Sequence, residues 1–305
     1  MPCKPCAVCG AARVSVISDR SDGRDPSPNL TDSSLVGSSR RSVGSVRLAQ
    51  CKVCGLAWQD VMPAPDILRR CYTELQDPYY VAEESGRRRA LRGCLRLLSR
   101  QPGHRTGRML DVGCSTGLFL ELAQAAGWSV YGIEPSSWLA DQARARLGDC
   151  ISSMTFEDTP LVEGSFDAVT FWDVLEHMPE PSAAVARAAR MLRANGLLAI
   201  SVPNIKSVFA RTMGFRWPLL LPEHLYYFSP SSLHLLLQHN GFVTLGLYRH
   251  WVYFRLRYVL HRLAQHGFGA ARVVQELIRK WSWMDREVPM LMGEVIAVAA
   301  KQAEC

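Results

Sequence analysis

The chain has 305 residues, 48% of them hydrophobic and 21% charged, so it can bury a substantial core and is expected to form one large domain or two modest ones. No uninterrupted apolar run reaches the ~18–20 residues that span a bilayer, and the N-terminus lacks the apolar stretch of a secretion signal. We therefore expect a soluble, cytoplasmic protein. The net charge of +7 leaves a nucleic-acid partner open, but the basic residues are spread out and their densest cluster, at 87–96, is typical of a solvated helix face.

Two Cys-x-x-Cys-Gly repeats mark residues 1–60. Cys6 and Cys9 form the first pair, and Cys51 and Cys54 form the second. Four thiolates at this spacing suit a tetrahedral structural Zn²⁺ with no open position for catalysis. We predict a zinc-binding cysteine-rich module, with Cys3 as an alternative ligand and free thiols or a redox pair as the competing interpretations. The residues at 18–46, rich in Ser, Asp, Arg, Gly and Pro, are expected to form a long flexible insertion in it.

Residues 61–107 contain prolines, several tyrosines and a basic segment with helical spacing. We interpret them as a helical connector that can fold over an active site as a lid.

From residue 108 onward, short apolar runs alternate with segments of helical spacing that end at glycine. Strands are expected at 109–112, 130–133, 168–172 and 197–202, and helices at 118–126, 138–147 and 182–193. This alternation predicts a parallel sheet covered by helices on both faces.

The last part of the chain interrupts this alternation. We expect an inserted loop at 205–228, a helix at 231–240, a strand at 242–248, a basic helix-rich insert at 250–290 and a closing strand at 294–300, all within one domain over 108–305. The second insert is interpreted as a substrate lid or core-packing helix, with a membrane-surface helix as the alternative.

A glycine-rich bend runs from Asp111 to Gly117, where a predicted strand turns into a helix. Glycine lets the backbone approach a ligand, and the start of the helix offers unpaired N–H groups. Glu134 ends the following strand, where a carboxylate can accept hydrogen bonds from both hydroxyls of a ribose. Together these features indicate an adenosine-containing cofactor, but the G-x-G-x-x-G pattern of dinucleotide sites is missing.

The bend resembles the first motif of class I S-adenosylmethionine-dependent methyltransferases. The resemblance covers roughly residues 105–250 and continues through Ser165–Val169, Trp172–His177 and Leu192–Gly196, in the order found in small-molecule methyltransferases similar to the ubiquinone-pathway O-methyltransferases. It implies a Rossmann-like, seven-stranded, mostly parallel sheet. One departure is Ser115, where the family usually has glycine.

The resemblance also implies which residues bind S-adenosylmethionine. They are Asp111, Gly113, Cys114, Ser115, Gly117, Glu134, Phe156, Glu157, Trp172 and Asp173. The first of these would anchor the bend near the methionine amino group, and the glycines would make room for methionine and ribose. Glu134 would hold the ribose, Phe156 and Glu157 would border the adenine, and Trp172 and Asp173 would flank the methionine end.

The candidate catalytic residues are Glu223 and His224, which follow the inserted loop. They resemble a Glu-His pair of sugar C-methyltransferases that also carry N-terminal zinc modules. A histidine titrates near neutral pH and can act as a base, although His224 could instead only hold its loop. His177 is expected to be structural or to lie at the rim.

The leading hypothesis is therefore methyl transfer to a small molecule, such as a sugar or a secondary-metabolite intermediate, with the acceptor atom and the oligomeric state left open. An RNA methyltransferase that grips RNA with the zinc module is disfavoured because Trp172-Asp-Val-Leu stands where such enzymes have Asn/Asp-Pro-Pro-Tyr. A non-catalytic cofactor-binding protein is disfavoured by the intact bend and by Glu134.

Overall fold

A computed structural model describes residues 5–18, 47–76, 81, 83–102, 106–221, 223–259, 281 and 285–303. Nearly all of the insertion predicted at 18–46, the alternative ligand Cys3 and most of the insert predicted at 250–290 lie outside the described residues. Within the described ranges, none of the helices has both the length and the apolar character needed to cross a membrane.

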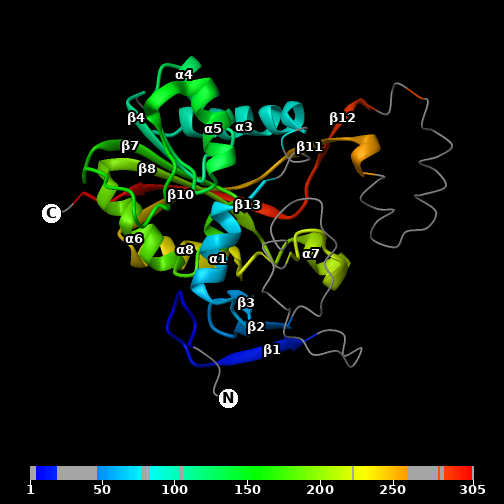
Figure 1. Cartoon of the computed structure of the whole chain (residues 1–305). Coiled ribbons are helices and arrows are strands. Elements are labelled where there is room, and N and C mark those ends of the chain that lie inside the picture. The colour runs from blue at the N-terminus through cyan, green and yellow to red at the C-terminus, as the bar shows by residue number, and fades with distance from the viewer. Residues whose placement is uncertain are drawn as a thin grey trace.

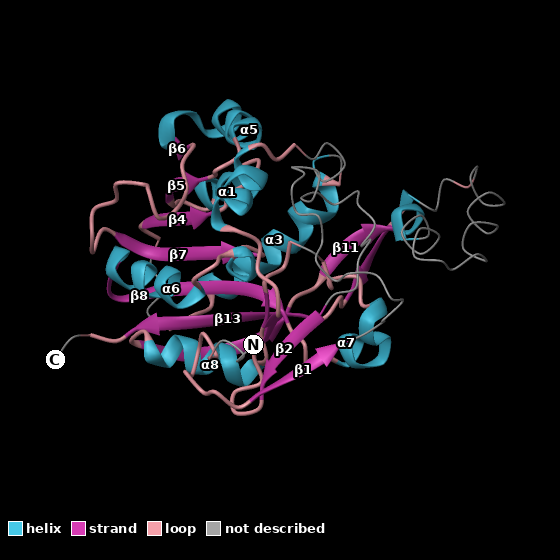
Figure 2. Ribbon diagram, turned by 60° about the horizontal axis from the view of Figure 1, so that its bottom comes forward, coloured by secondary structure: helices cyan, strands magenta, loops and turns pink. Residues whose placement is uncertain are grey.

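The described residues form a seven-stranded sheet in the order β10-β13-β8-β7-β4-β5-β6. These strands are β4 (Arg108–Val112), β5 (Ser129–Ile133), β6 (Ile151–Ser152), β7 (Phe166–Trp172), β8 (Leu192–Pro203), β10 (Phe242–Arg249) and β13 (Glu294–Lys301). The run from β8 to β6 is parallel, whereas β13 is antiparallel to both of its neighbours. Figure 2 shows β4, β7, β8 and β13 side by side. The Rossmann-like, mostly parallel fold predicted from the sequence is confirmed.

Helices cover both faces of this sheet (Figure 1). They are α3 (Glu84–Ser99), α4 (Leu118–Ala125) and α5 (Ser137–Leu147) on one face, and α6 (Pro181–Met191) and α8 (Pro230–His239) on the other. Neighbouring residues of a strand point to opposite faces. In β4, Met109 therefore packs with the first group of helices, while Leu110 packs with the second. The sheet is buried on both sides, which explains the continuous apolar runs in its strands.

A second, antiparallel sheet has the order β1-β2-β3-β9. Its strands are β1 (Val14–Ser18), β2 (Arg47–Cys51), β3 (Ala57–Gln59) and β9 (Tyr226–Tyr227). The first three come from the cysteine-rich N-terminal segment, whereas β9 comes from the segment that follows β8. In Figure 1, β1, β2 and β3 lie below the main sheet, beside α1 (Pro65–Thr73). Two parts of the chain that are far apart in the sequence therefore share one sheet.

The two predicted inserts differ from expectation. The region expected to be a loop at 205–228 contains α7 (Val208–Met213), the short helical turn η4 (Gly214–Arg216) and β9. The helix expected near the start of the 250–290 insert is wrong for Val252–Arg255, which forms β11 and pairs with β12 (Glu287–Met290). β-branched and aromatic residues, which this segment contains, favour strands. The spacing within so short a segment did not reveal the pairing, because β12 begins 32 residues after Arg255. Two further short turns are η2 (Gly148–Cys150) and η3 (Leu175–His177).

Two arginines of the basic cluster in α3 contact neighbouring side chains. Arg88 lies 2.8 Å from Glu84 and 2.9 Å from Glu121 of α4. The guanidinium of Arg89 lies 4.3 Å from the centre of the Tyr253 ring. These two arginines tie α3 to the elements around it, whereas Arg92 and Arg96 of the same cluster are exposed.

Candidate active site

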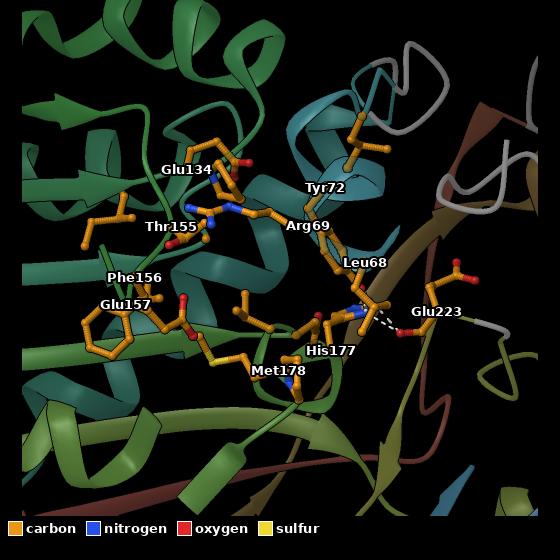
Figure 3. A pocket seen from close by; sticks show the side chains of 18 of the residues that line it. Leu68, Arg69, Tyr72, Glu134, Thr155, Phe156, Glu157, His177, Met178 and Glu223 are labelled. Carbon is orange, nitrogen blue, oxygen red and sulfur yellow. Dashed lines mark hydrogen bonds between the residues drawn. The ribbon is translucent and has the colours of Figure 1, made fainter. Parts of the chain in front are cut away.

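A cavity of about 590 Å³ lies at the carboxyl ends of β4, β5 and β7, within the size range of small-molecule sites. Its wall includes Pro65, Leu68, Arg69, Tyr72, Leu75, Val112, Gly113, Ser115, Ile133, Glu134, Pro135, Leu139, Thr155, Phe156, Glu157, Asp158, Trp172, Asp173, Val174, His177, Met178, Pro179, Glu180, Leu221, Glu223 and His224. Figure 3 shows many of these side chains pointing into the space between the sheet and α1. Ligands of open parallel sheets bind at this edge.

The predicted bend forms one end of the cavity. Gly113, Ser115 and Gly117 have φ angles of 70°, 50° and 75°, all in the left-handed region. A Cβ atom at Gly113 would lie 2.5 Å from Val174 Cγ2, so this position requires glycine. Ser115 adopts the left-handed conformation despite its side chain, which is consistent with the glycine usual there in the family.

The structure does not bring every predicted residue of the bend to the cavity wall. Gly113 and Ser115 line it, but Cys114 and Gly117 do not. Gly117 instead lies against α5, where a Cβ atom would be 2.9 Å from Leu147. The Asp111 carboxyl is buried in β4 outside the wall and accepts a 2.6 Å hydrogen bond from Thr170. Burial raises the pKa of Asp111 to about 8, so this carboxyl is mostly protonated at neutral pH.

Glu134 joins the second strand to the bend. Its carboxylate accepts hydrogen bonds from the backbone N–H groups of Ser115, at 2.8 Å, and Ser136, at 2.9 Å. Each oxygen keeps a further lone pair, and the residue lines the cavity. The carboxylate is therefore held in a fixed orientation from which it can accept hydrogen bonds from a ligand. The side-chain-free Gly113 and this carboxylate fit the ribose and methionine portions of an adenosyl cofactor.

The affinity for S-adenosylmethionine is expected to depend on pH through Glu134. Burial raises the pKa of the free-state carboxyl to about 7, against the opposing effect of the Ser136 and Ser115 amides. Ribose hydroxyls that donate to the ionised form, as the sequence predicts, would lower its pKa, so that binding would release a proton below pH 7. We expect the Kd to rise by up to about tenfold per pH unit as the pH falls below 7. Calorimetric titration from pH 5.5 to 8.5 measures this, and Glu134→Gln should flatten the profile; a flat wild-type profile would contradict the assignment.

The residues predicted to border the adenine line the same cavity. Phe156 is buried, packs edge-to-face with Phe171 at 5.7 Å, and lies 5.1 Å from the Arg187 guanidinium. Glu157 beside it is exposed. At the other side, Trp172 packs edge-to-face with Phe119 at 5.1 Å.

Asp173 follows Trp172 at the end of β7. It has a φ of 56° and accepts a 2.6 Å hydrogen bond from Ser201. This left-handed conformation turns the chain out of the strand, and the residue lines the cavity.

Two histidines meet at the end of the cavity away from Glu134. The rings of His177 and His224 lie 4.7 Å apart in an edge-to-face arrangement. The Nδ1 atom of His224 lies 2.8 Å from the carbonyl of Leu219, and that of His177 lies 2.9 Å from the carbonyl of Glu223. A carbonyl only accepts, so Nδ1 carries the proton in both rings and Nε2 carries the lone pair. Burial lowers the pKa of both histidines, which keeps them neutral.

The predicted partner Glu223 contributes its backbone here. Its carbonyl contacts His177, and Figure 3 shows its carboxylate turned away from that ring. The neighbouring carboxyl of Glu176 is buried, and burial raises its pKa well above the ordinary value. Within the described ranges, neither oxygen of Glu176 has a hydrogen-bond partner. Burial thus disfavours the charged form of all three groups, Glu176, His177 and His224.

Helix α1 forms one wall of the cavity. The Tyr72 hydroxyl lies 2.8 Å from His177 Nδ1, and Arg69 pairs with Asp158, which follows Glu157. Beyond the helix, Ser136 donates a 2.7 Å hydrogen bond to the Leu75 carbonyl. The sequence singled out none of these contacts, although a tyrosine-rich connector was expected to fold over the site.

Three groups of side chains in the described part of the chain have donor atoms close enough to hold a metal ion. They are Cys6, Cys9, Cys51 and Cys54; Glu176, His177 and His224; and Asp173, His250 and Glu294, with the atoms of each group within 4.8 Å of one another. In the first, the Sγ atoms of Cys6 and Cys54 lie 3.5 Å apart, as do those of Cys9 and Cys51. Amide N–H groups of Val53 and Cys54 point at the Cys51 sulfur. The structure thus brings the four predicted zinc ligands together.

The fold and cavity define a Rossmann-like, cofactor-binding class of enzyme, and comparison with known proteins specifies it. A family described as "Methyltransferase domain" matches residues 83–246. The ubiquinone biosynthesis O-methyltransferase of Aromatoleum aromaticum is 30% identical over 163 residues, which cover 49% of this chain and 70% of that protein. Its counterpart from Thiobacillus denitrificans is 30% identical over 150 residues, 45% of this chain and 65% of that protein.

Among solved structures, a chain from the complex between the Haloferax volcanii Trm112 methyltransferase activator and a putative methyltransferase has a TM-score of 0.51 and 15% identity. The alignment covers 72% of this chain and 95% of that one, and supports the fold alone. The chain belongs to the class I S-adenosylmethionine-dependent methyltransferases. The recognition made on the sequence motifs is confirmed.

Proposed function

We propose that the enzyme methylates a hydroxyl group of a small molecule, with His224 as the base. The observation that supports this most strongly is the neutral His224 ring, which lines the end of the cavity opposite Glu134 with its Nδ1 proton held by Leu219. S-adenosylmethionine supplies an activated methyl group. The residues of the chain then have to align the acceptor oxygen, exclude water and accept the hydroxyl proton.

The low basicity of His224 favours an acidic hydroxyl. Burial and the neighbouring His177 lower the pKa of His224 well below its ordinary value. A weak base is better matched to a phenol than to an alcohol, whose proton is far harder to remove. The similarity to ubiquinone biosynthesis O-methyltransferases agrees with a phenolic acceptor. Among the acceptors considered from the sequence, this ranks an aromatic secondary metabolite above a sugar.

The experiment is a methyl-transfer assay with deuterated-methyl S-adenosylmethionine and matched acceptors. The panel contains catechols and simple phenols, sugars with free hydroxyls, compounds with an acidic C–H, and total RNA. Mass spectrometry identifies the labelled product and the position of its methyl group. Transfer to phenolic oxygen supports the proposal, whereas transfer only to carbon, to sugar hydroxyls or to RNA overturns it.

We also propose that the four-cysteine cluster binds one structural Zn²⁺. The convergence of the four sulfurs and the amide N–H groups aimed at Cys51 support this. Gly10 and Gly55 follow the two cysteine pairs with φ angles of 68° and 78°, which lets each turn wrap the metal. With four thiolate ligands the ion has no open position, so its role is to hold the module together.

Removing the metal is expected to destabilise the protein. Cys51→Ser should abolish zinc binding and lower the midpoint of thermal unfolding, because binding free energy at such sites is folding free energy. Cys150→Ser removes a half-buried thiol outside the cluster and serves as the control. Native mass spectrometry with and without a chelator gives the stoichiometry. A wild-type chain that carries no zinc, or whose unfolding midpoint is unchanged by chelation, would refute the proposal.

A further inference from the structure

The segment that carries the candidate base runs directly into the sheet of the cysteine module. Tyr226 and Tyr227 of β9 pair with Trp58 and Ala57 of β3. The Gln59 backbone N–H donates a 2.9 Å hydrogen bond to the carbonyl of Leu225, the residue after His224. The backbone that follows His224 is therefore hydrogen-bonded into the antiparallel sheet of the cysteine module.

Gln59 adds a side-chain contact to the same segment. It is 8% exposed, and its Nε2 atom donates a 2.9 Å hydrogen bond to the carbonyl of His224. The same atom lies 3.5 Å from the carbonyl of Leu221. The side-chain amide of Gln59 thus contacts the carbonyls at the start and at the end of the turn from Leu221 to His224.

The two Cys-x-x-Cys turns also contact the ends of α8, which follows β9. The Ser229 hydroxyl, which caps the start of α8, donates a 2.9 Å hydrogen bond to the carbonyl of Cys54. At the other end of the helix, His239 Nδ1 lies 3.1 Å from the carbonyl of Val8. The module therefore contacts the segment on both sides of β9.

We propose that the cysteine module positions His224, with Gln59 as the positioning residue. This inference rests on the proposed role of His224 as the base. The ring of His224 is held through Leu219, but its backbone carbonyl is held by Gln59. A displacement of about 1 Å at a reacting group can cost about 10²-fold in rate, so loss of this contact is expected to lower turnover. S-adenosylmethionine binds at the opposite end of the cavity, and its affinity should not change.

The substitution Gln59→Glu tests this with a side chain of the same size. When protonated, the carboxylic acid can donate to the His224 carbonyl; when ionised, it cannot, and it repels that oxygen. We expect kcat close to the wild-type value at low pH and at least about tenfold below it once the new carboxylate ionises, with an unchanged Kd for S-adenosylmethionine. Gln50→Glu in β2, whose side chain donates a hydrogen bond to the Gly55 carbonyl within the module, is the matched control.

Amide hydrogen exchange over residues 219–228 provides a readout that does not depend on the chemistry. Exchange there should accelerate in Gln59→Glu as pH rises, after correction for the wild-type profile. Gln59→Met, which removes the donor without a charge, should show faster exchange at every pH. Wild-type exchange in both variants, a kcat profile like that of the wild type, or an equal fall in Gln50→Glu would overturn the inference. Faster exchange together with a fully active His224→Asn would instead refute the base and leave the positioning contact standing.

Discussion

Replacing Glu134 with alanine is expected to weaken S-adenosylmethionine binding by about 100-fold or more. A hydrogen bond to a charged group contributes about 1.5–3 kcal/mol, and a ribose offers two hydroxyls, so about 3 kcal/mol or more is lost. The substitution also removes the acceptor for the Ser115 and Ser136 amides, which loosens the bend itself. Calorimetry or equilibrium dialysis measures the Kd, and circular dichroism checks that the fold is kept.

The control for this substitution is Glu157→Ala. Glu157 lines the same cavity, but its side chain is exposed and its implied contribution is through the backbone. Its loss should change the Kd by no more than a few-fold. Unchanged affinity in Glu134→Ala, or an equal loss in both variants, would mean that the carboxylate after the second strand does not hold the cofactor.

Replacing His224 with asparagine is expected to lower kcat by about 10²–10⁴-fold, the usual contribution of a general base. Asparagine can still donate to the Leu219 carbonyl, as Nδ1 of the histidine does, but it has no basic nitrogen. The variant therefore separates the two roles considered for His224. If His224 is the base, the variant loses turnover. If His224 only holds the loop, asparagine can take over that role and turnover is kept.

The Kd for S-adenosylmethionine should stay at the wild-type value in this variant, because His224 lies at the other end of the cavity from Glu134. His234→Asn, an exposed histidine of α8, is the matched control and should keep full activity. Single-turnover kinetics with a phenolic acceptor provides the measurement. A His224→Asn enzyme with wild-type turnover would remove this residue as the base and leave it a structural role.

Local sequence patterns predicted most of the fold and the part of the candidate site around Gly113 and Glu134. The alternation of short apolar runs and glycine-terminated helices was enough for the sheet, because each strand–helix unit is continuous in the sequence. The bend at Gly113 and the carboxylate of Glu134 were found for the same reason, as both follow directly from strand ends. The four cysteines proposed to bind zinc could be chosen because their spacing within each pair is typical of zinc sites.

The other half of the site depends on contacts that no local pattern encodes. Tyr72 reaches His177 across 105 residues, and Gln59 reaches His224 across 165. Tyrosine and glutamine at these positions are ordinary residues of a helix and a short strand, and only the packing of α1 and β3 against the sheet gives them their neighbours. The strand at Val252–Arg255 was missed for a related reason, since its partner β12 comes late in the chain.

The position of α1 has a consequence for the exchange of substrates and products. Its residues Arg69 and Tyr72 both line the cavity, one paired with Asp158 and the other in contact with His177. A displacement of this single helix would therefore change the cavity wall beside Asp158 and beside His177 at the same time. Exchange of donor and product would then depend on one structural element, as lid movements do in many enzymes.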